Sequence, residues 1–180
     1  MPNYPEGNLQ AQIMSWLEVD GWSAQQESPD LLGGHVEADS GALDWCMSVE
    51  DVPDEVRLRL ASSCPVRVPE ARLPALAELF TRLNAVVRGS GFFYLLFDSG
   101  KFGHESALDL MDGKLTLKIL QQLFVSNLQA LDQAIPLVMA VAFGPVSPEQ
   151  AIRNNDEAQA QADAKAELAL ECAPSGSLLQ

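Results

Sequence analysis

Two histidines, His35 and His104, are the side chains of this sequence best suited to acid–base or metal chemistry at neutral pH. A metal site needs several ligands, and no second ligand lies at a useful spacing from His35. His104 is followed by Glu105, but adjacent side chains of an extended strand point to opposite faces, so the two cannot share a proton. No nucleophile motif lies near His104. We therefore predict that both histidines are structural and that the chain binds no metal.

Three cysteines, Cys46, Cys64 and Cys172, are the other groups with reactive side chains. They form no CxxC motif and their number is odd, which favours reduced thiols in a cytoplasmic protein over a disulfide framework. Cys46 and Cys64 lie in or near strand-like segments, where a thiol usually serves as a small core residue.

The carboxylates offer no clear catalytic centre either. The sequence has no Gly-rich phosphate loop and no GxSxG motif, and it implies no cofactor. Asp44, Glu50 and Glu55 are placed to pair across strands with Arg57 and Arg59, which would set register rather than do chemistry. We predict that the protein is not an enzyme; a hydrolase built on two carboxylates remains the alternative.

The net charge is extreme for an otherwise ordinary composition. With 25 acidic and 11 basic residues the formal charge is −14. Such a surface repels phosphate backbones and anionic lipids at long range, so we expect neither a nucleic acid nor a membrane as partner. A basic or amphipathic protein partner fits better. The first ten residues have no basic and apolar signal segment, which also points to the cytoplasm.

Apolar periodicity predicts the first half of the fold. Residues 9–19 form an amphipathic helix with Asn8 as N-cap and Gly21 at its end. Weak strands follow near 22–27 and 35–38. Alternating segments at 42–50 and 56–60, joined by a turn at 51–54, predict a hairpin with one buried and one wet face.

The second half starts with a helix that Pro69 opens at its first position, carries Asn84 among its apolar residues, and ends at Gly89. A hairpin then joins the strand within 91–97 to the strand beginning near Phe102. A helix over 116–142 follows, capped by Thr116 and kinked or split at Pro136. A last helix starts at Ser147. We expect one domain over residues 1–154, and an acidic Ala/Gln-rich tail over 155–180 as a fraying helix or a disordered segment.

The strand within 91–97 is the strongest candidate for binding. It is apolar on both faces, which predicts a central strand covered on each side. Phe93, Leu95 and Phe97 share one face, and Phe92, Tyr94 and Leu96 share the other. If the strand binds a partner, we predict that Phe92, Tyr94 and Leu96 do so. The apolar pattern by itself is more typical of plain core packing or of a homodimer contact, which is the competing interpretation.

The order of several structural motifs resembles the YbjN family of bacterial proteins. The resemblance covers roughly residues 9–152 and rests on Val68-Pro69-Glu70, Leu83-Asn84, Gly89-Ser90-Gly91-Phe92-Phe93, the turn Asp98-Ser99-Gly100, Asp132 and Pro136 in the long helix, and Gly144 with the segment 147–152. His104 and Glu105, and the acidic tail, depart from the family pattern.

This resemblance implies an α+β fold like that of type III secretion chaperones, with an antiparallel sheet, helices against it and frequent dimerisation. It brings no catalytic residues. We therefore predict a non-enzymatic cytoplasmic interaction protein, chaperone-like or an adaptor in assembly or stress regulation, that holds a partner segment on a sheet face or edge. A structural subunit of a larger assembly is the alternative.

Overall fold

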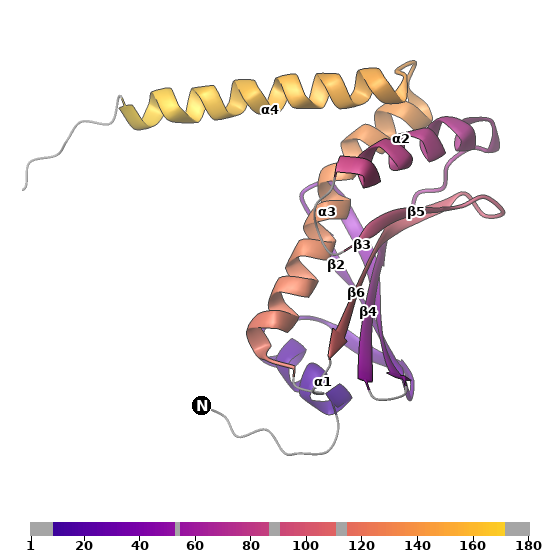
Figure 1. Ribbon diagram of the computed structural model, residues 1–180, viewed down its shortest axis with the longest axis vertical. Helices are drawn as coiled ribbons and strands as arrows, with labels where there is room; N and C mark the ends of the chain where they lie inside the picture. The colour runs from indigo at the N-terminus through magenta and orange to yellow at the C-terminus, as the bar shows by residue number, and fades with distance from the viewer. Residues whose placement is uncertain (1–8, 53–54, 87–90, 111–114, 172–180) are drawn as a thin grey trace, which may run out of the picture.

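The computed structural model describes residues 9–52, 55–86, 91–110 and 115–171. It confirms the predicted order of helix, four strands, helix, two strands and two helices (Figure 1). The helices are α1 (Leu9–Val19), α2 (Leu73–Val86), α3 (Leu117–Phe143) and α4 (Pro148–Glu171), and a 3-10 turn (Glu70–Arg72) precedes α2. The strands are β1 (Ala24–Ser28), β2 (Leu31–Ala38), β3 (Gly41–Val52), β4 (Glu55–Ser63), β5 (Phe92–Leu96) and β6 (Lys101–Leu110).

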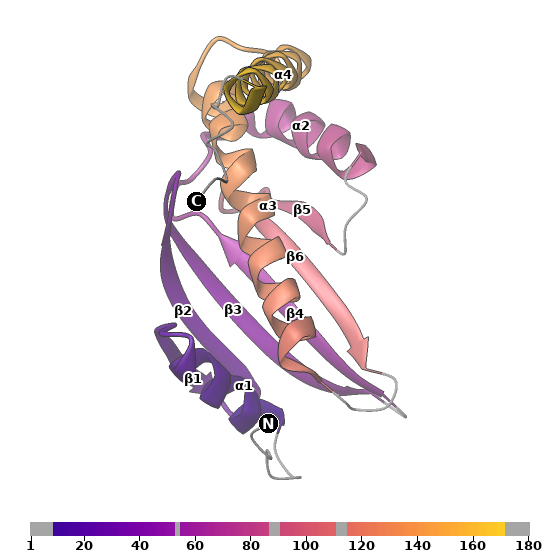
Figure 2. The same cartoon turned by 90° about the vertical axis from the view of Figure 1, so that its left-hand side faces the viewer.

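The six described strands form one antiparallel sheet in the order β1-β2-β3-β4-β6-β5. Figure 2 shows α1 and α3 lying across the same face of this sheet. On that side α2 packs over β5, where the Phe80 and Phe93 rings stack 5.5 Å apart. Among the described residues no helix covers the opposite face, which we call the open face. The fold is thus α+β, with helices on one side of the sheet.

The prediction that the strand within 91–97 is central is wrong, because β5 lies at the edge of the sheet. The long strand β6 pairs with β4 from Leu110 to Gly103, which leaves β5 only the outer side of β6. Both faces of the strand are apolar, but only one of them is covered. Phe93 lies under α2, whereas Phe92 and Leu96 point to the open face and remain half-exposed.

Local signals set the helix ends. Gly21 has φ +76° and ends α1, with the Trp22 N–H donating to the Leu17 carbonyl at 2.8 Å, so the predicted glycine end is confirmed. The Asn8 cap lies outside the described residues. Thr116 accepts the Ile119 N–H at 3.3 Å and caps α3 as predicted. Pro69 differs from its prediction: it precedes the 3-10 turn, and α2 begins only at Leu73.

Asn84 in α2 protects the edge strand. Its amide accepts the Phe93 N–H at 2.7 Å and donates to the Phe93 carbonyl at 2.9 Å. A neighbouring strand would make the same two hydrogen bonds, so this side chain blunts the edge of the sheet against pairing at Phe93.

The core centres on Phe124 of α3, which has no exposed surface. All three tryptophans of the chain meet its ring edge-on, at centroid distances of 5.8 Å for Trp16 and 4.8 Å for both Trp22 and Trp45. They come from α1, from the segment after it and from β3. One phenylalanine thus joins α1, α3 and the sheet.

Helix α3 is long, apolar and continuous through Pro136, so the proline does not split it. Within the part of the chain that the structure describes, it alone is long and apolar enough to cross a membrane, but half of that stretch is buried in the protein. It packs against β4 and β6. The helix thus contributes its buried half to the core of the domain.

Helix α4 leaves the body of the protein after its first turn. The Ser147 hydroxyl accepts the Gln150 N–H at 3.3 Å, and Ala151 is buried at 4% exposure. From Arg153 to Glu167 every side chain is exposed. Figure 1 shows the helix projecting away from the sheet, and it continues across position 155 without a break.

Candidate functional site

The open face contains a hollow of about 450 Å³. The register of the sheet explains it, because side chains that point to one face stand in rows across the strands. One row runs Gly33, Cys46 and Ala61, and the next places Ser63 beside Gly103. All five residues are small or lack a side chain, so the middle of the face is hollowed.

Tyr94 forms one wall of the hollow. It pairs with Gly103 across the β5–β6 ladder, and a Cβ at Gly103 would lie 2.6 Å from the tyrosine hydroxyl and 2.8 Å from Cζ. Its ring therefore lies across the glycine, and its hydroxyl donates to the Ser62 carbonyl at 3.4 Å. Only a residue without a side chain permits this position of the ring.

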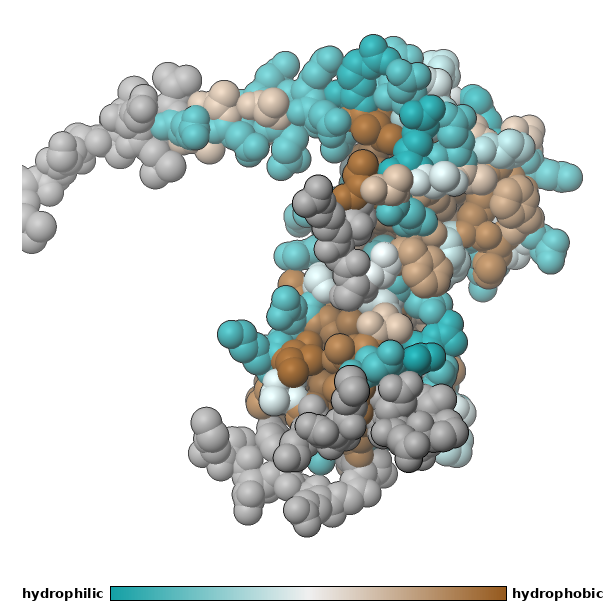
Figure 3. Space-filling view, viewed as in Figure 1, coloured by the Kyte–Doolittle hydropathy of each residue, from teal (hydrophilic) through white to brown (hydrophobic). Residues whose placement is uncertain are grey.

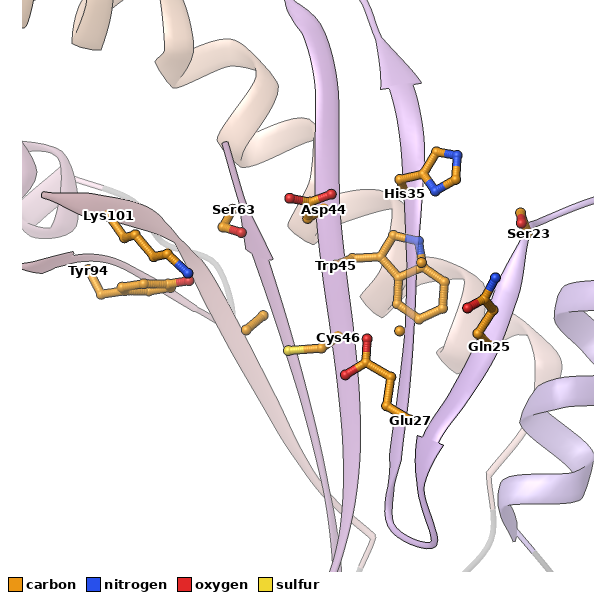
Figure 4. A pocket seen from close by; sticks show the side chains of 13 residues that line it. Ser23, Gln25, Glu27, His35, Asp44, Trp45, Cys46, Ser63, Tyr94 and Lys101 are labelled. Carbon is orange, nitrogen blue, oxygen red and sulfur yellow. The ribbon is translucent and has the colours of Figure 1, made fainter. Parts of the chain in front are cut away.

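Burial and nearby carboxylates affect the ionisation of two side chains in the hollow. Burial raises the pKa of the Cys46 thiol, and the nearby Glu27 and Glu105 carboxylates raise it further. Burial, with Cys46 and Glu105, also raises the pKa of the Tyr94 hydroxyl. Figure 4 shows the Glu27 carboxylate directed toward Cys46. Both groups are held in their neutral forms, so neither is an activated nucleophile at neutral pH.

Beyond the hollow, the open face carries a ladder of ion pairs. Arg59 donates to Glu105 at 2.5 Å and to Glu50 at 3.2 Å, and Arg57 donates to Asp109 at 2.5 Å. The hydrogen bond from Arg57 lowers the pKa of the Asp109 carboxyl. The predicted pairing of Arg59 with Glu50 is confirmed.

Asp44 does not meet an arginine across the strands as predicted. It lies opposite Ser63, at the rim of the hollow. The side chain of Glu55 lies outside the described residues. The arginines bind Glu105 and Asp109 of β6, which sequence reasoning missed because strand order decides which carboxylates come alongside β4.

The structure brings the three predicted binding residues together. Phe92, Tyr94 and Leu96 all point to the open face beside the hollow, where Phe92 and Leu96 are each 50% exposed. Figure 3 shows apolar side chains gathered over the outer end of the β5–β6 hairpin. The small residues of the hollow were missed, because their shared row exists only once four strands are in register.

The two histidines lie on different sides of the sheet. His35 is exposed at the rim of the hollow, whereas His104 is 3% exposed on the helix-covered side. Within the described ranges, no three His, Cys, Asp or Glu side chains gather in a way that could hold a metal ion.

These features define a class: an α+β domain with helices on one side of an antiparallel sheet, and an open, partly apolar face on the other. A family model, YbjN, described as "Putative bacterial sensory transduction regulator", matches residues 10–140. The chain belongs to the YbjN family. This assignment is consistent with a regulatory, non-enzymatic role. No curated protein matches the chain.

Proposed function

We propose that the protein is a non-enzymatic interaction module, chaperone-like or an adaptor in assembly or stress regulation. It binds a protein partner through the open face at Phe92, Tyr94 and Leu96. The observation that carries this proposal is the one-sided cover of the sheet, which leaves two large apolar side chains half-exposed beside a hollow. We further propose that it works in the cytoplasm and forms a homodimer. A structural subunit of a larger assembly is the second candidate.

The physical argument rests on burial. Full burial of a large apolar side chain stabilises a complex by about 1.5–3 kcal/mol, and Phe92 and Leu96 each retain half of their surface for a partner to cover. The hollow beside them has room for a side chain of the partner. Glu27 and Asp44 line it together with Lys101, so acidic groups outnumber basic ones at the hollow and favour a partner with basic groups.

The double variant Phe92→Asp with Leu96→Asp is expected to abolish capture of the partner. Two carboxylates would replace the apolar contact and stay unpaired in the interface, which costs several kcal/mol. The measurement is an affinity pull-down of tagged protein from its native cytosol at low and high salt, quantified by mass spectrometry. A dominant partner that the wild type retains and the variant loses is the expected result.

Leu117→Asp is the matched control. Leu117 is 39% exposed at the first position of α3, on the helix-covered side, where a negative charge suits the helix dipole. It should capture the partner as the wild type does. Equal capture by the double variant would exclude this face as the binding site. A partner that stays bound at fixed stoichiometry in high salt would favour the hypothesis of a structural subunit in a larger assembly.

For the tail over 155–180 we propose a solubilising role. A truncation after Asn155 is expected to change the midpoint of thermal unfolding by less than about 2 °C, because side chains from Asp156 to Glu167 are exposed. Differential scanning calorimetry checks this, and solubility at neutral pH should fall because the truncation removes net negative charge. A large drop in the midpoint would instead assign the tail a packing role.

A further inference from the structure

A second apolar slot lies on the helix-covered side, away from the open face. It has a volume of about 220 Å³ between β2 and α3. Val36 and Ala38 of β2 form its floor, and Val125 and Leu128 of α3 form its wall. Trp22 also lines it. Val125 is 42% exposed, a large fraction for an apolar side chain that faces a sheet.

The slot exists because α1 is short. Its 11 residues span about 16 Å, and the segment after it brings Trp22 against Phe124. One turn further along α3, at Leu128, no described helix lies beside α3 over the end of β2. Figure 2 shows α1 beside the lower part of α3, with the upper part of β2 uncovered next to it.

The walls of the slot are held together by a tertiary contact at its far end. In the turn after β2, the Ser40 N–H donates to the Asp132 carboxylate at 2.9 Å. The Ser40 hydroxyl donates to the Asp132 carbonyl at 3.0 Å. The tip of the β2–β3 hairpin is thereby fastened to α3, so the slot is formed before any partner arrives.

The charges at this end have one sign. Asp39 and Asp132 border the slot, and of the described residues that line it none is Lys, Arg or His. The whole chain has a net charge of −14. The volume is below the range of about 300–1,000 Å³ typical of small-molecule sites, so a side chain is a better occupant than a metabolite.

We infer that this slot docks a basic amphipathic α-helix of a protein partner. The helix would lie in the helix layer beside α3 and continue the row that α1 begins. Its apolar side chains would cover Val36, Val125 and Leu128, and a Lys or Arg would meet Asp39 and Asp132. This gives the module a second docking surface, on the other side of the sheet from Phe92 and Leu96, and it does not depend on the open face.

The probe is a labelled amphipathic helical peptide of about 18 residues made of Leu and Lys, a length at which an isolated helix can form. Binding is followed by fluorescence anisotropy on the full chain. A peptide of the same composition with scrambled order controls for attraction to the negative surface, since it keeps the charge but not the apolar stripe. We expect the amphipathic peptide to bind at least tenfold more tightly than the scrambled one.

Val125→Lys is expected to weaken binding of the amphipathic peptide at least tenfold, because it places a charge against the apolar stripe and repels the basic face. Ile119→Lys is the matched control: Ile119 is 39% exposed on the same helix outside the slot, and its variant should bind nearly as the wild type does. Circular dichroism of both variants establishes that they fold alike.

Equal binding by Val125→Lys and Ile119→Lys would overturn the inference, as would equal binding of the scrambled peptide. The Phe92→Asp and Leu96→Asp double variant separates the two surfaces. It should retain the part of peptide binding that Val125→Lys removes; if that part is lost, the peptide occupies the open face and the slot proposal fails. Self-association that Val125→Lys removes in sedimentation would assign the slot to a second copy and also contradict the inference.

Discussion

Phe124→Ala is expected to lower the free energy of unfolding by about 3–5 kcal/mol, the largest effect of any single truncation considered for this chain. The Phe124 ring is fully buried and contacts Trp16, Trp22 and Trp45 at once. Its removal leaves a cavity that three large, separately anchored rings cannot close together. Both the lost burial and the unfilled space therefore contribute to the cost.

Urea unfolding followed by tryptophan fluorescence measures this free energy. Every tryptophan of the chain contacts Phe124, so the signal reports on the site of the substitution. Val125→Ala is the control at the next position. Val125 is 42% exposed, so its truncation should cost less than about 1 kcal/mol. A cost for Phe124→Ala no larger than for Val125→Ala would mean that Phe124 does not join α1, α3 and the sheet.

Mild acid is also expected to lower the free energy of unfolding strongly, because His104 is buried. Asn127 of α3 directs its amide Nδ2 at the His104 Nδ1, 3.1 Å away, and at the Ser106 hydroxyl, 3.0 Å away. The same Nδ2 lies 3.1 Å from the Leu60 carbonyl, which orients the amide. The amide nitrogen faces the His104 Nδ1 with a donor group, which favours the form of the ring that has no proton on Nδ1.

The described groups that contact this ring carry no charge that could compensate a proton on it. Phe93 of β5 meets the imidazole edge-on at 4.8 Å, Asn127 covers it from α3, and Ser62 contacts the His104 carbonyl from β4. The His104 Nε2 has no hydrogen-bond partner among the described residues. Burial accordingly lowers the pKa of His104.

The direction of the pH effect follows from this lowered pKa. Above about pH 6.5 the histidine is neutral in both the folded and the unfolded chain, and it causes no penalty. As the pH falls through that value the unfolded chain binds a proton that the folded chain excludes. Stability then falls by up to about 1.4 kcal/mol per pH unit, until the pH reaches the pKa of the folded state.

His104→Gln is expected to flatten this dependence between pH 7 and pH 5.5, because the glutamine amide does not titrate and its oxygen can still accept from Asn127. His35→Gln is the control, since His35 is exposed. Urea midpoints across the pH range measure both variants. If His104→Gln retains the wild-type slope while His35→Gln loses it, the buried histidine is not the source of acid sensitivity.

The helices and strands of this fold, and part of its candidate site, could be predicted from the sequence. Gly21 and Thr116 end and begin helices as expected, because capping depends on residues within one turn of the helix. The shared face of Phe92, Tyr94 and Leu96 follows from the two-residue period of a strand. That period does not tell which of the two faces is covered, and it led to a central strand where the structure has an edge.

The remaining features depend on contacts between distant residues. The order of the strands puts β6 beside β4, and this pairing decides that β5 is an edge, that Arg59 meets Glu105, and that Gly33, Cys46 and Ala61 share a row. The meeting of three tryptophans at Phe124 has the same origin.

The amino-acid sequence by itself determined the kinds of elements, their order and the side chains on each face, because periodicity and capping act between near neighbours along the chain. Only the tertiary structure decided which face is covered, where the hollow lies, and that a slot remains beside α3. These features depend on how segments far apart in sequence pack together, and the energy of that packing cannot be inferred from any one segment.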